Sequence, residues 1–506
     1  MKTQSVFFSF LVFITTFSVL AQAKKTIPAS QIEFQSSEYA NKMYYLASHY
    51  GKYQTLLDSV KGTNDGKLVF KKDQKYIEGI YMLVTPDKKI ELEFLMDANQ
   101  KFMIQVSNPT DKTLAISNSP LNQDFNSFNS FFKTKMEGIK SLEKTLSDKK
   151  TKQDSAVVIT DLKKIQSEIN VYKNEYIQAN PTNTLALLFK MSQPIDNFLN
   201  KTAEEKLATK TDSIAYLKKH FFDGIDFKDS RLLRNPFLEN RITTYFNTFV
   251  PVTPEAVTTE IVQILNQTDQ PNGEVFKYLS LHFIDLYAEP KIMGMDRVFI
   301  NIYNTYFKNK EYAWLQLKQK EFFKFKVSSI KDNLVGDKGR NLFMLTQDQK
   351  RIDLYDIKAK YTVIAFWDPT CGHCATEIPK MHQLYETEWK QKGVVVFAIN
   401  NNTNEMVKWK EFIEKEKLSD WTNVYPAPVV TGNYTKEDVD FQTLYNVRQT
   451  PVMYLLDKDK KIIACYQCAG CSKRFFCIRC DTWSVRYCYL RCNGDQNSST
   501  GYSNIV

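Results

Sequence analysis

The chain has little glycine and proline, the residues that most often interrupt regular structure. Its 506 residues include 16 of each, and it contains neither an internal repeat nor a long low-complexity tract. Long disordered linkers are therefore not expected, and most of the chain should fold. At roughly 100 to 200 residues per domain, this length predicts about three domains.

A basic stretch interleaved with aromatic residues is also absent. The formal net charge is +10, but the lysine pair Lys149 and Lys150 has Asp148 and Asp154 close by. Mixed charges of this kind are typical of a solvated surface, so we expect no nucleic-acid partner.

Only one long apolar run is present, at the N-terminus. Lys2 precedes the apolar segment 6–20, and the Ala-Gln-Ala sequence at 21–23 has the small-x-small form of a cleavage site. This order predicts a signal peptide, residues 1–23, removed after Ala23. The run is shorter than the ~20 residues that span a bilayer, so an uncleaved anchor is the weaker interpretation. No cysteine follows the run, and lipid attachment there is not expected. We expect the mature chain in the periplasm or cell envelope, where disulfide chemistry is permitted.

The hydrophobic period predicts two domains before residue 328. Residues 27–118 contain the turn signal Asn64-Asp65-Gly66 and apolar residues that alternate with a period of two, which predicts a small antiparallel β-domain. These alternating residues are Leu92, Phe94, Met96, Phe102, Ile104 and Val106.

From 119 to 327 the apolar residues recur every three or four positions, which predicts an α-helical domain that serves as a spacer or docks a partner. They are Phe125, Phe128, Phe132, Met136, Ile139, Leu142, Leu146, Val158, Leu162, Ile165 and Ile169. Asn180-Pro181 should end the second helix.

Residues 328–464 contain the motif that carries the chemistry. An apolar run of strand length, 361–367, leads into Cys371-Gly372-His373-Cys374, and helical spacing follows. This order places Cys371 at a helix N-terminus, where unpaired amides and the helix dipole stabilise a thiolate. Cys374, one turn later, can close a disulfide and resolve a mixed disulfide. We therefore predict Cys371 as the attacking thiol and Cys374 as the resolving thiol, with His373 favouring the thiolate if it is cationic or donating.

The competing interpretation is that the two cysteines form half of a zinc site. A zinc site requires two further ligands, and none lies nearby in a matching knuckle. His382 is the nearest histidine outside the motif, and we expect it at the surface of the same helix. We predict no metal here and no cofactor besides the redox-active dithiol.

Residues 337 to about 463 resemble the TlpA/ResA-like branch of the thioredoxin superfamily. The resemblance is carried by Phe366-Trp367, the Cys-Gly-His-Cys motif, Glu377-Ile378-Pro379, the segment 394–400 and Thr450-Pro451. The upstream half more loosely resembles multidomain exported oxidoreductases of Gram-negative bacteria, which carry a β-domain and a helical domain before the thioredoxin module. The fold class expected is thus an α/β thioredoxin-like fold at the C-terminal end, preceded by β and α-helical domains.

The resemblance implies a periplasmic thiol-disulfide exchange activity on partner proteins. It also implies that Pro379 kinks the active-site helix, that the segment 404–416 is an inserted helix, and that Pro451 is cis. An X-Pro bond takes the cis form at low cost, and in this fold the turn packs against the dithiol and offers backbone groups to an extended substrate. An ordinary trans proline is the alternative. With His373 and Glu377, residues Thr450, Pro451 and Trp367 form the set expected to tune the dithiol or bind substrate.

Two departures from the family pattern stand out. Ala365 occupies the position where thioredoxin has a buried aspartate that assists proton transfer to the resolving cysteine. Glu377 could substitute for it, or as an exposed helix residue do nothing.

The second departure is the segment 465–506, where a terminal amphipathic helix is expected and seven cysteines occur instead. They are Cys465, Cys468, Cys471, Cys477, Cys480, Cys488 and Cys492. A zinc or iron-sulfur site is one interpretation. Translation in a wrong frame or a sequence error is the interpretation we favour, because seven thiols in an exported redox protein invite mispairing.

The direction of the reaction stays open at this point. The histidine of the motif favours an oxidase or isomerase, whereas the resemblance favours a reductase. A reductase outside the cytoplasm needs a membrane electron donor, and an oxidase an acceptor. The alternative function is a cell-envelope binding protein that uses the thioredoxin fold as a scaffold.

Overall fold

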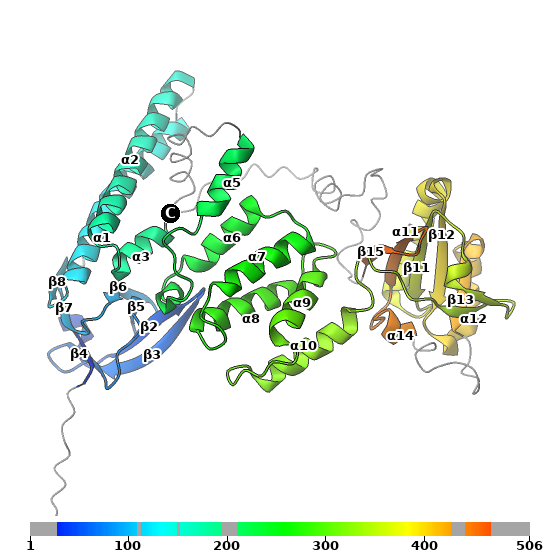
Figure 1. Ribbon diagram of the computed structural model, residues 1–506, viewed down its shortest axis with the longest axis horizontal. Helices are drawn as coiled ribbons and strands as arrows, with labels where there is room; N and C mark the ends of the chain where they lie inside the picture. The colour runs from blue at the N-terminus through cyan, green and yellow to red at the C-terminus, as the bar shows by residue number, and fades with distance from the viewer. Residues whose placement is uncertain (1–27, 109–112, 149–151, 194–209, 427–440, 467–506) are drawn as a thin grey trace, which may run out of the picture. The chain divides into compact units, whose positions relative to one another are not determined.

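The computed structural model describes residues 28–108, 113–148, 152–193, 210–426 and 441–466 (Figure 1). The predicted signal peptide and the cysteine-rich segment after residue 466 lie outside these ranges. The chain forms two compact units, Met1–Gln193 with Arg234–Pro236, and Pro194–Leu233 with Phe237–Val506. Within the described ranges, no helix has both the length and the apolar character needed to cross a membrane.

The first unit contains two four-stranded sheets with the strand orders β4-β1-β7-β8 and β3-β2-β5-β6. All described pairings in them are antiparallel except the parallel pair β1/β7. The strands are β1 (Ser30–Gln35), β2 (Met43–Tyr50), β3 (Tyr53–Lys61), β4 (Lys67–Lys72), β5 (Gly79–Val84), β6 (Ile90–Met96), β7 (Lys101–Asn108) and β8 (Thr113–Ser117), with a short 3-10 turn η1 (Ser37–Tyr39).

The period-two pattern is confirmed by the burial of this unit's core. Phe94 and Phe102 are both buried, whereas Glu93 and Lys101, which precede them, are exposed. Phe34 of β1 meets Phe94 of β6, in the other sheet, edge to face with ring centroids 5.2 Å apart. The alternating apolar residues of both sheets therefore form one shared core.

Three helices belong to the same unit, α1 (Pro120–Asp148), α2 (Lys152–Ala179) and α3 (Thr184–Met191). The predicted helical stripe is confirmed, since Phe128 of α1 is buried with its ring 5.5 Å from Tyr172 of α2 and 4.5 Å from Phe189 of α3. The second helix ends at Ala179, directly before the predicted stop at Asn180.

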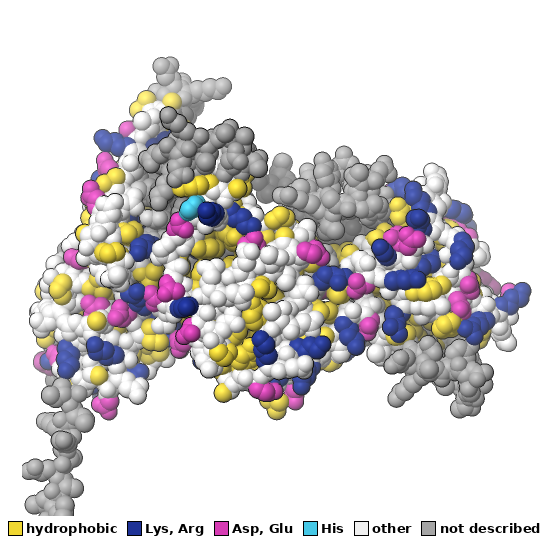
Figure 2. All heavy atoms as spheres, in the orientation of Figure 1, with side chains coloured by type: hydrophobic (Ala, Val, Ile, Leu, Met, Phe, Trp, Pro, Cys, Tyr) yellow, Lys and Arg dark blue, Asp and Glu magenta, His cyan; other side chains and the backbone are white. Residues whose placement is uncertain are grey.

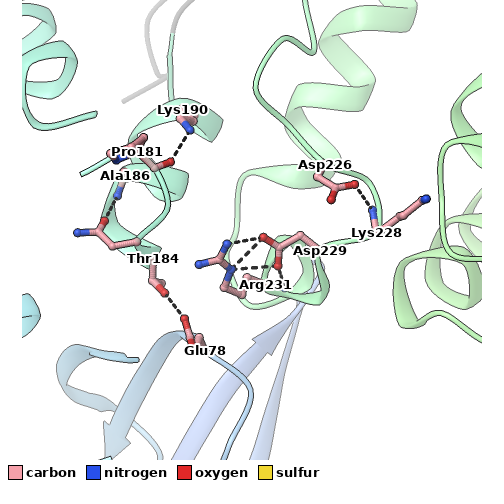
Figure 3. A network of polar contacts seen from close by, with 10 residues as sticks. Glu78, Pro181, Thr184, Ala186, Lys190, Asp226, Lys228, Asp229 and Arg231 are labelled. Carbon is pink, nitrogen blue, oxygen red and sulfur yellow. Dashed lines mark hydrogen bonds and ion pairs between the residues drawn. The ribbon is translucent and has the colours of Figure 1, made fainter. Parts of the chain in front are cut away.

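Polar side chains fix these helices to the sheet. Asn122 of α1 is buried, and its amide group pairs with both backbone groups of Leu95 in β6, at 2.7 and 2.8 Å. In Figure 3, Thr184 at the start of α3 points to Glu78, and its hydroxyl lies 3.0 Å from the carboxylate. The predicted helical domain, residues 119–327, is thus shared between the two compact units, because α1 to α3 pack with the sheets.

A group of helices, up to α10, precedes the sheet of the second unit. Their apolar faces bury large side chains such as Phe276, Ile284 and Phe299. The elements are α5 (Lys210–His220), η2 (Ser230–Leu233), α6 (Leu238–Phe249), α7 (Pro254–Asn266), α8 (Glu274–Ala288), α9 (Asp296–Ile302), the π-turn η3 (Tyr303–Phe307) and α10 (Leu317–Ile330).

The C-terminal part has the thioredoxin-like fold that the sequence predicted. Its sheet has the order β10-β9-β13-β12-β11-β14-β15, with β11, β12 and β13 parallel and the other pairs antiparallel. The strands are β9 (Phe343–Thr346), β10 (Arg351–Asp353), β11 (Tyr361–Trp367), β12 (Val394–Asn400), β13 (Thr422–Pro426), β14 (Val452–Asp457) and β15 (Ile462–Tyr466).

Both faces of this sheet are covered, which explains why β11 is apolar without alternation. One core includes Val363, Trp367 and Trp409, and the other includes Ile364 and Phe366. The helices and short helical turns of this part are η4 (Leu354–Asp356), α11 (Gly372–Leu384), η5 (Tyr385–Trp389), η6 (Lys390–Lys392), η7 (Thr403–Glu405), α12 (Met406–Lys415), η8 (Leu418–Asp420) and α14 (Phe441–Leu444).

Two further predictions can be compared with this part of the chain. The inserted helix expected at 404–416 is present as α12. Cys465, the first cysteine of the predicted tail, lies in β15 opposite Tyr454, so the strand extends to Tyr466. On the surface, Figure 2 shows basic and acidic side chains interspersed over the visible face.

Candidate active site

The end of β11 and the start of α11 position the two cysteines. The strand ends at Trp367, a loop of three residues follows, and Cys371 occupies the N-cap of α11. The backbone N–H of Cys371 donates to the carbonyl oxygen of Asp368 at 3.1 Å. Cys374 lies in the first turn of the helix, so both thiols sit where the helix amides are unpaired.

Cys371 is half-buried, and its Sγ lies 3.3 Å from the carbonyl oxygen of Thr450. Partial burial opposes ionisation of this thiol. Hydrogen bonds to its sulfur outweigh burial and hold the pKa of Cys371 below its usual value. They involve the side chain of Thr450, the backbone and side chain of Cys374, and the backbone of His373. Its thiolate is therefore available at a lower pH than that of an ordinary cysteine.

Cys374 is in a different environment, because it is fully buried in the core beneath the helix. Burial raises the pKa of Cys374 to about 12, although a hydrogen bond with the backbone of Asp368 opposes the shift. Ala365, at the position of the missing aspartate, belongs to the same apolar core. Cys374 thus stays protonated unless a base accepts its proton.

Thr450, which the resemblance places beside the dithiol together with Pro451, has its carbonyl oxygen 3.3 Å from the Cys371 sulfur. The Thr450–Pro451 peptide bond is cis, Pro451 is buried, and β14 begins at the next residue. The Cys371 thiol donates a hydrogen bond to the carbonyl oxygen of Thr450, which lies 79 residues away in the chain. Residues from two distant segments therefore meet at the thiol.

The other predicted site residues differ in how far they are exposed to solvent. His373 is exposed between the two cysteines. Trp367 is fully buried and its ring packs on Phe412 of α12, 5.0 Å between centroids, so it supports the site from below and offers no surface to a substrate. Pro379 lies inside α11.

Glu377 differs from the expectation of an exposed helix residue. Its side chain is 16% exposed, and its Oε1 lies 3.0 Å from Nζ of Lys380. Its Oε2 is buried without a hydrogen-bond partner among the described residues. The helix turns this face toward the body of the domain, which the local sequence does not reveal.

Asp368 is a site residue that sequence reasoning missed. Its carboxylate accepts hydrogen bonds from Thr370, in the loop before Cys371, and from Asn402 on the next strand's loop. The Asp-Pro-Thr sequence was an available signal, because an aspartate commonly bonds the backbone two residues ahead in such a turn. The contact with Asn402 has no local signal.

Three side chains in this domain could hold a metal ion, namely His382, Glu386 and Asp420, whose ligand atoms lie within 4.8 Å of one another. Nζ of Lys390 already lies 3.0 Å from Glu386 and 3.1 Å from Asp420. An ion-pair network centred on the Lys390 ammonium therefore explains the cluster. His382, expected at the surface of the helix, is partly exposed at 17%, and its ring meets Trp421 edge to face at 5.6 Å.

Comparison with known proteins places this site in a family. The AhpC/TSA family model matches residues 335–465, and a model described as a domain of unknown function, DUF5106, matches residues 168–333. Thiol-disulfide oxidoreductase ResA of Bacillus cereus (strain ZK / E33L) is 30% identical over 129 residues, which are 26% of this chain and 67% of that protein. This chain belongs to the ResA-like thiol-disulfide oxidoreductases. A second ResA, from Oceanobacillus iheyensis, is also 30% identical over 145 residues, 27% of this chain and 68% of its own length.

Among solved structures, this ResA-like chain is similar to a domain of a possible thiol-disulfide isomerase from Cytophaga hutchinsonii. The identity is 37%, the match covers 28% of this chain and 90% of that one, and the TM-score is 0.24. The AhpC/TSA match begins at residue 335, so the sheets of the first unit and the helices up to α10 precede it. The chain is thus an oxidoreductase of thiols and disulfides with additional upstream structure.

Proposed function

We propose that this ResA-like oxidoreductase is exported to the periplasm and exchanges disulfides with partner proteins through Cys371 and Cys374. The observation that carries the proposal is the contrast between the two thiols. Cys371 is half-buried at the N-cap of α11 with a lowered pKa, whereas Cys374 is fully buried with a pKa raised to about 12. One thiol is thus suited to attack a partner and the other to act only after attack.

The reaction proceeds through a mixed disulfide. The Cys371 thiolate attacks one sulfur of a partner disulfide, and the partner's other sulfur leaves as a thiolate that takes a proton from water. Cys374 then gives up its proton and attacks the Cys371 sulfur, so that the second partner thiolate leaves and is protonated. Two electrons pass to the partner, and a Cys371–Cys374 disulfide remains. The reverse sequence oxidises partner thiols.

Neighbouring residues support these steps in the proposal. Glu377, whose Oε2 is buried and lacks a hydrogen-bond partner among the described residues, accepts the proton of Cys374. Thr450 and Pro451 hold an extended partner segment beside the sulfur, His373 favours the thiolate from the exposed side, and Trp367 supports the loop from the core. The dithiol is the only redox group proposed, and a membrane electron donor or acceptor restores it after each turnover. Cell fractionation with N-terminal sequencing tests the export, with Lys24 expected as the first residue.

Trapping of the mixed disulfide tests the proposed roles. In full-length protein, Cys374→Ser should accumulate mixed disulfides with partner proteins through Cys371, because the resolving thiol is gone. Cys371→Ser should form none and should lose insulin reduction by at least about 10²-fold, as expected for removal of a nucleophile. Non-reducing electrophoresis and mass spectrometry identify the adducts.

Cys465→Ser provides the matched control, since Cys465 is a half-buried thiol on β15 outside the dithiol. It should retain insulin reduction and form no new adducts. Full activity in Cys371→Ser would reject the proposal and favour a binding protein that uses the fold as a scaffold.

The reduction potential of the Cys371/Cys374 pair decides the direction of exchange. A value at or below about −250 mV would match a reductase supplied by a membrane donor, whereas one above about −180 mV would match an oxidase or isomerase. The protein is equilibrated against glutathione, and mass spectrometry of the peptide that contains both cysteines measures the fraction oxidised. Because only this peptide is measured, the cysteines after residue 464 do not interfere.

A further inference from the structure

The side chain of Asp368 makes several hydrogen bonds within and beyond the loop that leads to Cys371. Its Oδ1 accepts the backbone N–H of Thr370 at 2.7 Å and the Thr370 hydroxyl at 2.6 Å. Its backbone carbonyl oxygen accepts the N–H of Cys371 at 3.1 Å, and its backbone also hydrogen-bonds the Cys374 sulfur. Asp368 therefore contacts both cysteines through its backbone and shapes the intervening turn through its carboxylate.

The second carboxylate oxygen reaches a different segment. Oδ2 of Asp368 accepts a hydrogen bond from the side-chain amide of Asn402 at 3.2 Å. Asn402 is itself fixed, because its N–H donates to Oδ1 of Asn400 at 2.9 Å and its Oδ1 accepts the N–H of Asn404 at 3.3 Å. Asn400 is fully buried at the end of β12. The turn before Cys371 is thus tied to the fixed end of a neighbouring strand, just before η7 and α12.

Position and charge act in opposite directions on the thiol. A fixed turn keeps the Cys371 sulfur within reach of the α11 amides, which favours the thiolate. The Asp368 carboxylate, as a nearby negative charge, disfavours it. A substitution that breaks the contact between Asp368 and Asn402 without changing the charge therefore separates the effect of position from the effect of charge. Small displacements of reacting groups can slow a reaction considerably.

We propose that Asp368 is a positioning residue for the dithiol, whose carboxylate, held by Asn402, fixes the turn so that the Cys371 sulfur stays aligned with the α11 amides and with Cys374. This inference rests on the proposed function of the two cysteines. It adds to the machinery of exchange a pair of residues from the loops that follow β11 and β12.

The test is the pH profile of Cys371 alkylation in the full-length reduced protein. Iodoacetamide is the probe, and mass spectrometry of the Cys371 peptide keeps the other thiols out of the signal. Asn402→Ala, which is neutral, should raise the midpoint and slow alkylation at pH 7 by about 3- to 10-fold, a shift of about half to one pKa unit. Asn401→Ala is the matched control, because Asn401 lies on the same loop and its side chain bonds Gln442 instead. It should titrate like the wild type.

Rescue separates positioning from general stability. Asn402→Asp alone places two carboxylates together and should raise the midpoint further. The double exchange Asp368→Asn with Asn402→Asp restores one donor and one acceptor between the two positions, leaves the net charge unchanged, and should return the midpoint toward the wild-type value. Thr370→Val removes only the hydroxyl donor to Asp368 and should shift the alkylation midpoint in the same direction as Asn402→Ala. It replaces Asn402→Ala as the test if Asn402→Ala does not fold.

A wild-type profile in folded Asn402→Ala or Thr370→Val would overturn the inference, and so would a double exchange that is folded but not rescued. A failure of the proposed function gives a different result, because Cys371→Ser then keeps its exchange activity. The alkylation profile needs no partner protein and still shows whether the turn positions Cys371.

Discussion

Cys371 and Cys374 lie one helical turn apart and have opposite chemical properties. The N-cap position gives Cys371 hydrogen bonds to its sulfur and partial access to solvent. Cys374 points into the apolar core that also contains Ala365 and Trp367, where a charged sulfur is costly. A single helix therefore supplies both a reactive and a protected thiol, and the order of their reactions follows from their environments.

The pH dependence of alkylation should reveal this difference. In the reduced protein, Cys371 should react with iodoacetamide with a midpoint below the roughly 8.5 of an ordinary thiol, because its pKa is lowered. Cys374 should stay unmodified between pH 5 and 9, because its pKa is raised to about 12. Peptide mass spectrometry follows each cysteine. In urea-unfolded protein both should titrate like ordinary thiols, and equal rates for the two cysteines in folded protein would contradict the assignment.

At the scale of elements, the ends of helices determine much of this structure. α11 begins at the motif because the chain leaves β11 through a fixed turn, and α3 begins where Asn183 caps it. The side chain of Asn183 accepts the N–H of Ala186 at 2.8 Å and also donates to the hydroxyl of Tyr176 at 3.0 Å. Nearly all of α3 is buried, so the position of its first turn is coupled to the packing of the first unit.

Removal of this cap should destabilise the first unit. Asn183→Ala should lower its free energy of unfolding by about 0.5 to 2 kcal/mol, the usual loss for an N-cap residue. Urea denaturation followed by circular dichroism measures the change. Asn183→Asp keeps an acceptor for the Ala186 N–H and should retain most of the stability. Equal losses in the two variants would show that the cap is not the relevant contact.

At the scale of the whole molecule, the first unit and the thioredoxin-like fold have separate apolar cores. Phe94 belongs to the core of the first unit and contacts Phe34, Tyr81 and Phe102. The dithiol lies on the core that includes Trp367 and Trp409. A defect in one core removes packing contacts there and leaves the other core's contacts unchanged.

Phe94→Ala should therefore lower the free energy of unfolding of the first unit by about 3 to 5 kcal/mol, as for other large core truncations. The alkylation midpoint of Cys371 should stay at its wild-type value. Scanning calorimetry and the alkylation profile together test this. Leu57→Ala, at a side chain that is 43% exposed on β3, is the control and should cost much less. A shifted Cys371 midpoint in Phe94→Ala would contradict the separation.

The sequence by itself determined the features that depend on neighbours in the chain. The strand 361–367, the helix start at Cys371 and the helical stripe around Phe128 each follow from local period and order, and the structure has all three. The cis bond before Pro451 followed from the resemblance.

Tertiary structure decided what depends on residues far apart in sequence. The burial of Glu377 and His382, and the packing of α1 to α3 with the sheets, arise from contacts that a local pattern does not encode. The bond between Asp368 and Asn402 joins positions 34 residues apart, which only the pairing of β11 with β12 brings together. A hydrophobic period specifies which face of an element is buried, but the partner of each polar group on that face is determined only when the elements pack.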